Sequence, residues 1–487
     1  MRPLRPCTRD KDGPMTSTTP EHVDELCQRA ARAFPQARQA DDAERASWLR
    51  AGADALDAAT DELVAIADDE THLGSPRLPG ELKRTTNQLR LFADVVTEGS
   101  YLEATIDHPN PDTVPPIPDL RRVLRPLGPV AVFAASNFPF AFSVAGGDTA
   151  SALAVGCPVV VKAHSGHPAL SRRVFKILEQ ALREAGAPDG ILGLVGGREA
   201  GVALAEHPAI TAVGFTGSIP GGRAIHDAVA ARPAPIPFFG ELGSLNPVVV
   251  TAAADRARGA ALAEGLAGSF QLGVGQFCTK PGVVFVPRGS ALENEVAAHV
   301  GDAGRMLTDR IADGFASGAA RVEEVPGVDA VAAGDGSLVA ACDASTLAAH
   351  ADVLLEEVFG PFTLLVRYSD EEELLGGLAL MEGNLTATLH AEDEDDIGAV
   401  LASLEQLAGR VLFAGWPTGV AVSWAQHHGG PWPATTSQHT SVGATAVRRF
   451  LRPVAYQEAP ERALPPALRE ANPLGIPRRV DGELVLP

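Results

Sequence analysis

The stretch CPVVVKAHSGHPALSRRVFKILEQALREAGAPDGILGLVG, residues 157–196, contains two short β-rich runs on either side of one helical segment. The runs are CPVVVKA (157–163) and GILGLVG (190–196), and the helical segment ALSRRVFKILEQALREAG spans 169–186. A strand, a helix and a second strand in this order are typical of a βαβ unit, in which both strands lie parallel in one sheet. This stretch therefore predicts an α/β fold.

Three more β-rich runs flank this unit: VAVFAAS (130–136), TAVGFTG (211–217) and NPVVVTA (246–252). Because helical segments separate them, we predict that the first half of the chain is a nucleotide-binding α/β domain with a mostly parallel sheet. Residues 21–73 carry apolar residues at helical spacing among Ala and charged residues, which predicts two or more surface helices.

A second α/β segment is predicted after Glu241. Its expected strands are GVVFVP (282–287), FTLLVRY (362–368) and TATLHA (386–391). Residues 296–350 are rich in Ala, Gly and Asp and have weak periodicity, so no elements are assigned there. The second segment is predicted to pack directly on the first, because no long low-complexity linker separates them.

The composition limits the classes of partner. The chain has 487 residues, of which 61 are acidic and 40 basic, and its formal net charge is −21. This charge disfavours binding to nucleic acid or to an anionic membrane. No uncharged apolar run reaches the roughly 20 residues of a membrane-spanning helix, and residues 1–15 lack the apolar stretch of a secretory signal. We therefore expect a soluble protein with small-molecule partners.

The five cysteines are an odd number, lie far apart and form no CxxC pair (Cys7, Cys27, Cys157, Cys278 and Cys342). This pattern suggests neither a disulfide framework nor a metal site, and a reducing cytoplasm fits it best. Cys278 differs from the others, because GQFCTKPGV (275–283) places it between glycines where no helix or strand needs it. A free cysteine is often only a small buried hydrophobe, so the residue alone leaves a structural role open.

Two polar residues occupy apolar surroundings. Glu241 in FFGELGSLNP (238–247) is either a solvated loop carboxylate or a desolvated one whose raised pKa suits a general base. Asn137 in VFAASNFPFAF (132–142) is either a turn residue or an amide that donates to an oxyanion. Neither residue decides between its two roles by itself.

A glycine-rich turn is a candidate phosphate site. GFTGSIPGG (214–222) places Gly217 after a predicted strand and Gly222 at the start of a predicted helix. Amides at a helix N-terminus can hold a cofactor phosphate. The strict GxGxxG fingerprint is missing, so a simple turn remains the alternative.

Together these motifs resemble the aldehyde dehydrogenase superfamily. The segments that carry the resemblance occur in the family's order: PLGPVAVFAASNFPF, VVVKAHSGHP, VGFTGS, FFGELGSLNP, GQFCTKPG and EEVFGPF. The resemblance runs from about residue 20 to residue 458 and implies a Rossmann-type cofactor domain plus a second α/β catalytic domain. ELGSLNP and the tail PTGVAVSWAQHHGGPWPATTSQHTSVGATAVRRFLRPVAYQ resemble the branch that oxidises 2-oxoglutarate semialdehyde (2,5-dioxovalerate) to 2-oxoglutarate.

The resemblance implies three catalytic residues. Cys278 matches the nucleophile, whose thiolate attacks the aldehyde carbon. Asn137 and the backbone N–H of Cys278 match the groups that hold the resulting oxyanion. Glu241 matches the base that activates water to hydrolyse the thioester.

The resemblance also implies the cofactor contacts. Lys162 matches the lysine at the adenine ribose, Ser218 the serine near the pyrophosphate, and Glu357 with Phe359 the pair that positions the nicotinamide. NAD-preferring relatives commonly carry a Glu where this chain has Ser165. A neutral Ser165 next to Lys162 and His164 predicts that NADP is accepted and preferred, with NAD weaker. The simpler role for Ser165 is to cap the following helix.

The domain plan follows from the same resemblance. Residues 20–240 are expected to form the cofactor-binding domain, with the return of part of the C-terminal segment, and residues 241–430 the catalytic domain. Residues 431–487 are expected to be a C-terminal segment and a candidate interface in a homodimer or homotetramer. Residues 1–19 are predicted to be a disordered extension, with Met15 as an alternative start.

Other functions remain open at this stage. A CoA-acylating dehydrogenase would not need Glu241 for hydrolysis, and a catalytically silent binding protein would not need Cys278 and Asn137 as well. The substrate could also be another aliphatic aldehyde or semialdehyde. Ala414 stands where relatives often carry an Asn, which leaves the geometry of the substrate loop open.

Overall fold

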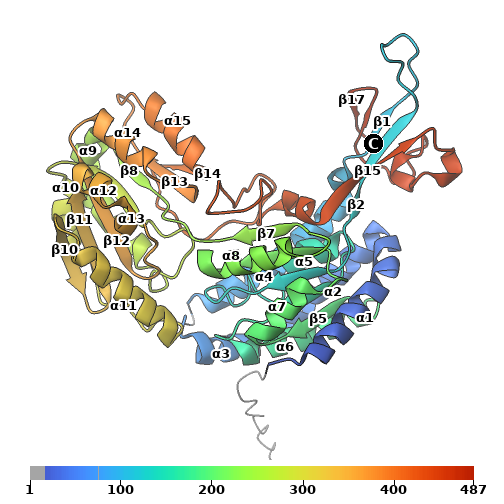
Figure 1. The fold of residues 1–487 in the computed structure, drawn as a ribbon, viewed down its shortest axis with the longest axis horizontal. Coiled ribbons are helices and arrows are strands. Elements are labelled where there is room, and N and C mark those ends of the chain that lie inside the picture. The colour runs from blue at the N-terminus through green and yellow to red at the C-terminus, as the bar shows by residue number, and fades with distance from the viewer. Residues whose placement is uncertain (1–16, 75) are drawn as a thin grey trace, which may run out of the picture.

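The computed structural model describes residues 17–74 and 76–487, and three β-sheets organise this part of the chain. Two of them form the cores of two α/β lobes, which we call the first and second lobes, and the third projects from the first lobe as an arm (Figure 1). The predicted α/β fold is confirmed. No helix in the described ranges is both long and apolar enough to cross a membrane.

The first lobe contains a five-stranded, fully parallel sheet of order β5-β4-β3-β6-β7. Its strands are β3 (Val130–Phe133), β4 (Val159–Lys162), β5 (Leu192–Val195), β6 (Ala212–Thr216) and β7 (Phe238–Glu241). The chain runs outward from β3 to β5 and then returns to β6 on the other side of β3. Ligands of such sheets bind beyond the carboxyl ends of the strands where the order reverses, which here is between β3 and β6.

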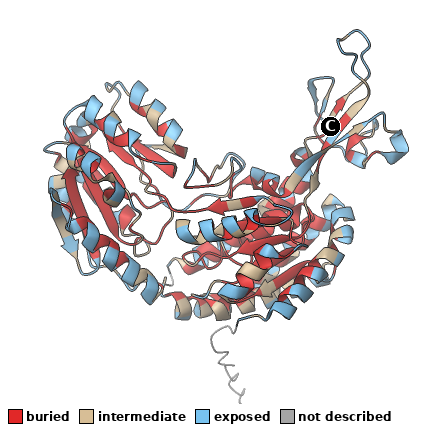
Figure 2. Ribbon diagram, viewed as in Figure 1, coloured by how far each residue is buried: buried red, intermediate tan, exposed pale blue. Residues whose placement is uncertain are grey.

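Both faces of this sheet are covered, because alternate side chains of a strand point to opposite sides. Val130 and Val132 pack into one apolar cluster and Ala131 and Phe133 into another. The helices on the first side are α2 (Asp42–Ala58), α3 (Thr60–Thr71), α4 (Leu78–Glu98), α5 (Gly147–Ala154) and α6 (Pro168–Glu184). Those on the second side are α1 (Pro20–Gln39), α7 (Arg198–Glu206) and α8 (Ile219–Ala230). Figure 2 shows the buried strands between helices that are exposed on their outer faces.

The second lobe contains a seven-stranded sheet of order β10-β11-β12-β9-β8-β13-β14, parallel except for the β10–β11 hairpin. The strands are β8 (Val248–Val250), β9 (Val283–Pro287), β10 (Val328–Gly334), β11 (Ser337–Asp343), β12 (Phe362–Tyr368), β13 (Asn384–His390) and β14 (Ala408–Phe413). One face is covered by α9 (Ala252–Phe270), α10 (Ala291–Glu295) and η2 (Val296–Ala298). The other is covered by α11 (Asp309–Glu323), α12 (Ala344–Ala349), α13 (Ala351–Leu354), α14 (Glu371–Ala379) and α15 (Gly398–Leu407).

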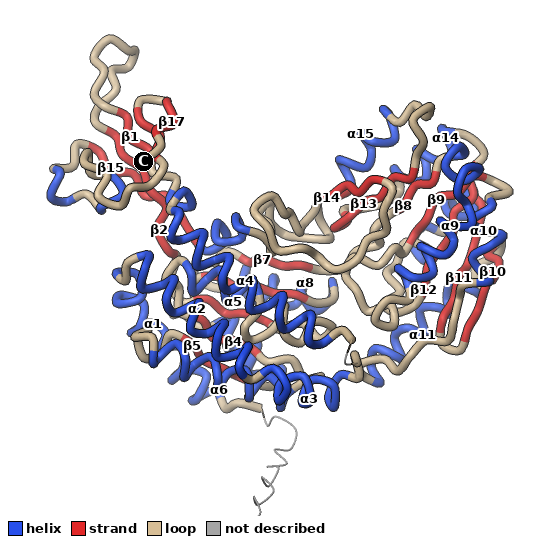
Figure 3. The backbone as a smooth tube through the Cα atoms, turned by 180° about the vertical axis from the view of Figure 1, so that it is seen from behind, coloured by secondary structure: helices blue, strands red, loops and turns tan. Residues whose placement is uncertain are grey.

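The arm is a five-stranded sheet that the sequence did not predict. It has the order β15-β2-β1-β16-β17 and projects away from both lobes (Figures 1 and 3), while Leu451 at its base packs against the first lobe. Its strands are β1 (Thr105–Asp107), β2 (Leu120–Pro126), β15 (Leu451–Gln457), β16 (Arg478–Val480) and β17 (Glu483–Val485), with η1 (Ser100–Leu102), η3 (Ala444–Phe450), η4 (Glu461–Ala463) and η5 (Pro466–Leu468) nearby. β2 pairs with β15, which lies more than three hundred residues later in the chain, as in Val123 opposite Val454.

Residues 1–16 of the expected N-terminal extension lie outside the described residues. The described part begins with ordered contacts: Thr18 N donates to Gly196 O at 2.8 Å, and the Thr19 side chain caps α1 by accepting from His22 N. These contacts attach the start of α1 to the end of β5.

Candidate active site

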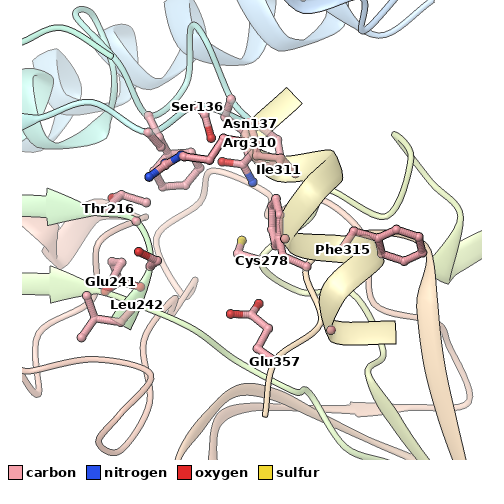
Figure 4. A pocket seen from close by; sticks show the side chains of 18 of the residues that line it. Ser136, Asn137, Thr216, Glu241, Leu242, Cys278, Arg310, Ile311, Phe315 and Glu357 are labelled. Carbon is pink, nitrogen blue, oxygen red and sulfur yellow. The ribbon is translucent and has the colours of Figure 1, made fainter. Parts of the chain in front are cut away.

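A cavity of about 510 Å³ lies at the carboxyl ends of β3 and β6, and both lobes contribute to its walls. Asn137, Glu241 and Cys278 all line it. Figure 4 shows the side chains of Asn137, Glu241 and Glu357 around Cys278. The structure therefore brings the three expected catalytic residues together, although they come from three different segments of the chain.

Close backbone packing positions the Cys278 loop. The side-chain amide of Asn246 donates to Cys278 O at 2.8 Å and to Lys280 O at 2.9 Å. Gly275 has a φ of +64°, and a Cβ there would lie 2.2 Å from the carbonyl carbon of Gly360. Only glycine fits such a close approach with a positive φ. Gly275 thus lets the Cys278 loop pack against the turn at Gly360.

The segment ELGSLNP acts on this loop through residues that the sequence analysis did not identify. Ser244 Oγ donates to Asn246 Oδ1 at 2.7 Å, and Asn384 Oδ1 accepts from Leu245 N at 2.8 Å and Asn246 N at 2.9 Å. Asn246 itself has a φ of +52°, a conformation that Asn adopts more readily than most residues. Ser244 and Asn384 therefore fix the position of Asn246, whose side chain binds the backbone of Cys278.

His428 is a further residue that the sequence analysis missed. Its Nε2 lies 3.7 Å from Cys278 Sγ and 4.0 Å from Glu241 Oε2. Burial lowers its pKa to about 3, and the nearby Arg410 and Arg84 add to this effect. The ring is therefore neutral near pH 7, and its Nε2 lies between the thiol and the carboxyl group. The only signal for it is the His pair in AQHHGGP, and no spacing connects that pair to Cys278.

Burial alone does not distinguish Cys278 from the other described cysteines. It raises the pKa of Cys278 to about 12, with a further contribution from Glu241. Burial also raises the pKa values of Cys27, Cys157 and Cys342 to about 12. Among these four, Cys278 alone lines the cavity and has an imidazole beside its sulfur.

Glu241 ends β7 and is buried. Burial raises its pKa well above the usual value, and Arg449, which is paired with Asp148 at 2.6 Å, only partly opposes this effect. Its Oε2 has no hydrogen-bond partner among the described residues. A desolvated carboxyl group with a free oxygen is suited to proton transfer near neutral pH.

Asn137 follows β3 and its side chain is engaged with the cysteine loop. Its Nδ2 donates to Gln276 O at 2.9 Å, and its backbone carbonyl accepts from Arg77. The Arg77 guanidinium lies 4.7 Å from the ring centres of both Phe138 and Phe277. These contacts hold the amide at the cavity wall beside Cys278.

The glycine-rich turn after β6 opens onto the same cavity. Gly217 and Ser218 line it, and the Ser218 side chain caps α8 by accepting from Gly221 N at 3.4 Å. Gly222 does not line the cavity, and a Cβ there would lie 2.2 Å from Leu242 Cδ2. Gly222 is therefore needed for close packing of α8. In the first turn of α8, Gly221 N and Gly222 N donate to Ser218 and Pro220 has no N–H, which leaves the N–H of Ile219 for a phosphate.

Lys162 ends β4, His164 and Ser165 follow it, and the structure places these three residues differently. His164 lines the cavity, and burial lowers its pKa to about 3, with contributions from His167 and Lys162. Lys162 is half-buried at the end of the strand, where burial and then Arg310 lower its pKa. Ser165 is exposed and does not line the cavity.

The alternative role of Ser165 as a helix cap is wrong. The N-cap residue of α6 is His167, and it makes no side-chain capping bond. Glu70 from α3 accepts from Ala169 N at 2.8 Å and Leu170 N at 2.9 Å instead. Ser165 is therefore not needed to begin α6.

Arg310 is a cation that the sequence analysis did not identify. It lies in the first turn of α11, lines the cavity from the second lobe and acts electrostatically on both Lys162 and His164. The sequence analysis could not place Arg310, because this residue falls within 296–350, where no helices or strands were assigned.

Glu357 and Phe359 line the same cavity. Burial raises the pKa of Glu357 and lowers that of Lys280, and each group opposes the shift of the other. Lys280 Nζ also donates to Phe362 O at 2.6 Å. The cavity thus has the turn that begins α8 and a buried carboxyl group among its walls, which fits a dinucleotide with a pyrophosphate and a ribose.

Ala414, the departure noted from the sequence, follows β14 with a φ of +53°. Its backbone N–H donates to Leu389 O at 3.1 Å. This left-handed conformation costs Ala more than Asn. The turn keeps its backbone hydrogen bond even without the Asn side chain.

Comparisons with known proteins agree with this geometry. A family model described as the aldehyde dehydrogenase family matches residues 1–431. The chain is 48% identical to the alpha-ketoglutaric semialdehyde dehydrogenase 2 of Azospirillum brasilense, over 95% of this chain and 91% of that protein. It is 42% identical to the alpha-ketoglutaric semialdehyde dehydrogenase of Acinetobacter baylyi, over 96% of this chain and 92% of that protein. A solved structure of proline utilization A from Bradyrhizobium japonicum matches in fold with a TM-score of 0.77 at 24% identity, over 91% of this chain and 45% of that longer chain.

Proposed function

Because the chain belongs to the aldehyde dehydrogenase family, we propose that it oxidises 2-oxoglutarate semialdehyde to 2-oxoglutarate with NAD(P). The chemistry is carried by one observation: Cys278 Sγ, His428 Nε2 and Glu241 Oε2 meet at 3.7 Å and 4.0 Å on the wall of one cavity. The substrate is the aldehyde named in the two curated relatives, which this chain matches over nearly its whole length.

The first half of the reaction forms a bond to sulfur. His428 takes the proton of the Cys278 thiol, and the sulfur attacks the aldehyde carbon. Proton transfer and attack occur together, because burial favours the neutral forms of both the thiol and the imidazole and disfavours a free thiolate beside an imidazolium. The Asn137 amide and the Cys278 N–H donate to the oxyanion, for which Asn137 Nδ2 leaves its contact with Gln276 O.

The second half releases the acid. When bound, the nicotinamide ring supplies the hydride acceptor, and loss of hydride from the carbon on sulfur leaves a thioester on Cys278. Glu241 then removes a proton from water as the water attacks the thioester carbonyl. The carbon–sulfur bond breaks, the sulfur regains its proton from His428, Glu241 passes the proton of the water to solvent, and 2-oxoglutarate departs.

Product identification tests this proposal. The purified protein is incubated with 2-oxoglutarate semialdehyde and NADP, with and without CoA, and the product is identified by mass spectrometry. We expect 2-oxoglutarate at the same rate in both reactions. An acyl-CoA product would favour the CoA-acylating alternative, and no reduction of the dinucleotide with any of a panel of aldehydes would favour a binding protein.

The cofactor preference rests on two cations near Ser165. Lys162 and Arg310 lie near the end of β4, where the adenine ribose is expected, together with the His164 ring, which burial keeps neutral. An uncharged Ser165 beside them does not repel a 2′-phosphate, and cations bind phosphate strongly in a partly desolvated site. We propose that NADP is preferred over NAD.

Ser165→Glu is expected to shift the ratio of kcat/KM values from NADP towards NAD by roughly 10- to 100-fold, because the new carboxylate repels the 2′-phosphate. Steady-state rates with both dinucleotides measure the ratio. Ser165→Gln is the matched control, since it has the same size without the charge, and it should keep the NADP preference. A wild-type protein that strongly prefers NAD, or a Glu variant with full NADP activity, would remove Ser165 from this role.

We propose that the protein forms a homodimer or homotetramer through the arm and the edge of the second lobe. β14 pairs on one side only, and Phe413 at its end is 56% exposed. In the arm, Leu484 and Leu486 are 63% and 68% exposed. Exposed strand edges with apolar side chains are typical of surfaces that pair with another chain. Light scattering is expected to give at least twice the mass of 50.6 kDa, and a monomer would contradict the proposal.

A thiol nucleophile must stay reduced, so we propose that the protein acts in a reducing cytoplasm. Treatment with a mild oxidant is expected to inactivate it, and a reducing thiol should restore activity.

A further inference from the structure

Arg84 on α4 has a buried guanidinium group that is only partly satisfied. Its Nε donates to Val420 O at 2.9 Å, in the loop that follows β14. Its Nη1 and Nη2 are buried and have no hydrogen-bond partner within the described ranges. The group lies 5.4 Å from the ring centre of Phe142, which is itself a wall of the cavity. A buried guanidinium with two free donor atoms is costly unless a ligand satisfies them.

Arg410 on β14 is in the same situation. Its Nε and Nη2 are buried and have no partner in the part of the chain that the structure describes. β14 pairs with β13, so that Arg410 lies opposite Thr386, next to the cavity-lining Leu385. Two arginines from different lobes thus carry unsatisfied donors into the interior of the protein.

Both guanidinium groups lie close to the nucleophile. Arg84 and Arg410 each act electrostatically on Cys278 and on His428. Neither arginine lines the cavity that contains Ser218 and Glu357. Phe142, which the Arg84 guanidinium faces, and Leu385, next to the strand partner of Arg410, do line it, so that an aldehyde at Cys278 can extend towards both arginines.

Glu81 does not neutralise Arg84 and Arg410. Glu81, which acts on Arg84, accepts from Phe140 N at 2.9 Å and Ala141 N at 3.1 Å and lies 3.6 Å from Arg77. Neither Arg84 nor Arg410 forms an ion pair with a carboxylate of the described residues, whereas Arg90 on the same helix pairs with Asp54 and Asp57. The site therefore has an excess of positive charge and lacks an anionic partner.

We propose that Arg84 and Arg410 bind the carboxylate of the aldehyde substrate while its aldehyde carbon lies at Cys278 Sγ. This inference rests on the proposed function and adds the residues that select an aldehyde with an acid group. A carboxylate matches the two free nitrogens of a guanidinium in a bidentate arrangement. Val420 connects the loop after β14 to Arg84, so that binding of the acid group orders both walls of the substrate site.

The test uses Arg84→Met and Arg410→Met with two aldehydes, 2-oxoglutarate semialdehyde and pentanal, which has the same five-carbon chain without the acid and the 2-oxo group. Each variant is expected to lose about 10- to 100-fold in kcat/KM for the semialdehyde, the value of one or two charge-assisted hydrogen bonds. The kcat/KM for pentanal should change by less than about 3-fold, because that chain makes no such bond. Arg84→Lys, which keeps the charge but not the fork, should retain part of the preference for the semialdehyde.

Arg90→Met is the matched control on the same helix, and it should leave the ratio between the two aldehydes unchanged. Equal losses on both aldehydes in the Arg84 and Arg410 variants would mean a structural role and overturn the inference. Unchanged rates on both would overturn it as well.

Inhibition of pentanal oxidation by 2-oxoglutarate separates this inference from the proposed function. The wild-type protein should be inhibited competitively, and the inhibition should weaken by about 10-fold or more in the two Met variants. Equal inhibition of all three proteins would overturn the inference whichever aldehyde is the natural substrate. A wild-type protein that oxidises pentanal as efficiently as the semialdehyde would contradict the proposed substrate instead.

Discussion

Cys278→Ala is expected to abolish aldehyde oxidation and leave dinucleotide binding intact. Without the sulfur no bond forms to the aldehyde carbon, and removing a nucleophile typically lowers kcat by about 10⁴-fold or more. The alanine side chain keeps the loop contacts, because Asn246 binds the Cys278 backbone carbonyl and not its sulfur. Dinucleotide reduction at 340 nm measures the activity, and calorimetric titration measures the binding.

Cys342→Ala is the control for this experiment. Cys342 is fully buried in β11, and its pKa is raised to about 12 as for Cys278, but it does not line the cavity. The control should keep wild-type kcat. A companion variant, His428→Gln, should slow the alkylation of Cys278 by iodoacetamide. Substantial turnover in Cys278→Ala would show that Cys278 is not the nucleophile.

Glu241→Gln is expected to give one rapid burst of reduced dinucleotide followed by turnover about 10²- to 10³-fold slower than in the wild type. Acylation of Cys278 does not need this carboxylate, whereas attack of water on the thioester does. Stopped-flow absorbance measures the burst, and mass spectrometry of the quenched protein should find the acyl group on Cys278. Glu392→Gln, which only removes an ion pair with Arg258 at 2.6 Å, should turn over normally.

The pH dependence follows from the raised pKa of Glu241. Burial favours its neutral form, so the carboxylate that acts as a base appears only as the pH rises through a value well above the usual 4.5. The rate of thioester hydrolysis in the wild type should therefore fall as the pH is lowered through that value. Glu241→Gln should lack this dependence. Full steady-state turnover in the Gln variant would assign the base to another group.

The sequence by itself determined the α/β fold and most of the strands of the two lobes. Each predicted run contains or overlaps an observed strand: β3, β4, β5 and β6 in the first lobe, and β8, β9, β12 and β13 in the second. The run NPVVVTA was grouped with the first half of the chain, but its strand β8 belongs to the sheet of the second lobe. These strands could be predicted because strands buried on both faces consist almost entirely of apolar residues such as Val, Leu and Phe. The cavity-lining residues that lie in family motifs could also be predicted, because these motifs are short segments that resemble the family. These residues are Asn137, Glu241, Cys278, Glu357 and Phe359.

Only the tertiary structure decided which residues surround these motifs. The arm depends on β2 pairing with β15 across more than three hundred residues, and no local pattern encodes such a pairing. Likewise Arg84 is on a helix of the first lobe, Arg410 on a strand of the second and His428 in a late loop, yet all three act on one thiol. Side chains of this kind read as ordinary surface charges in a sequence, because burial and electrostatic proximity arise only when the lobes pack together.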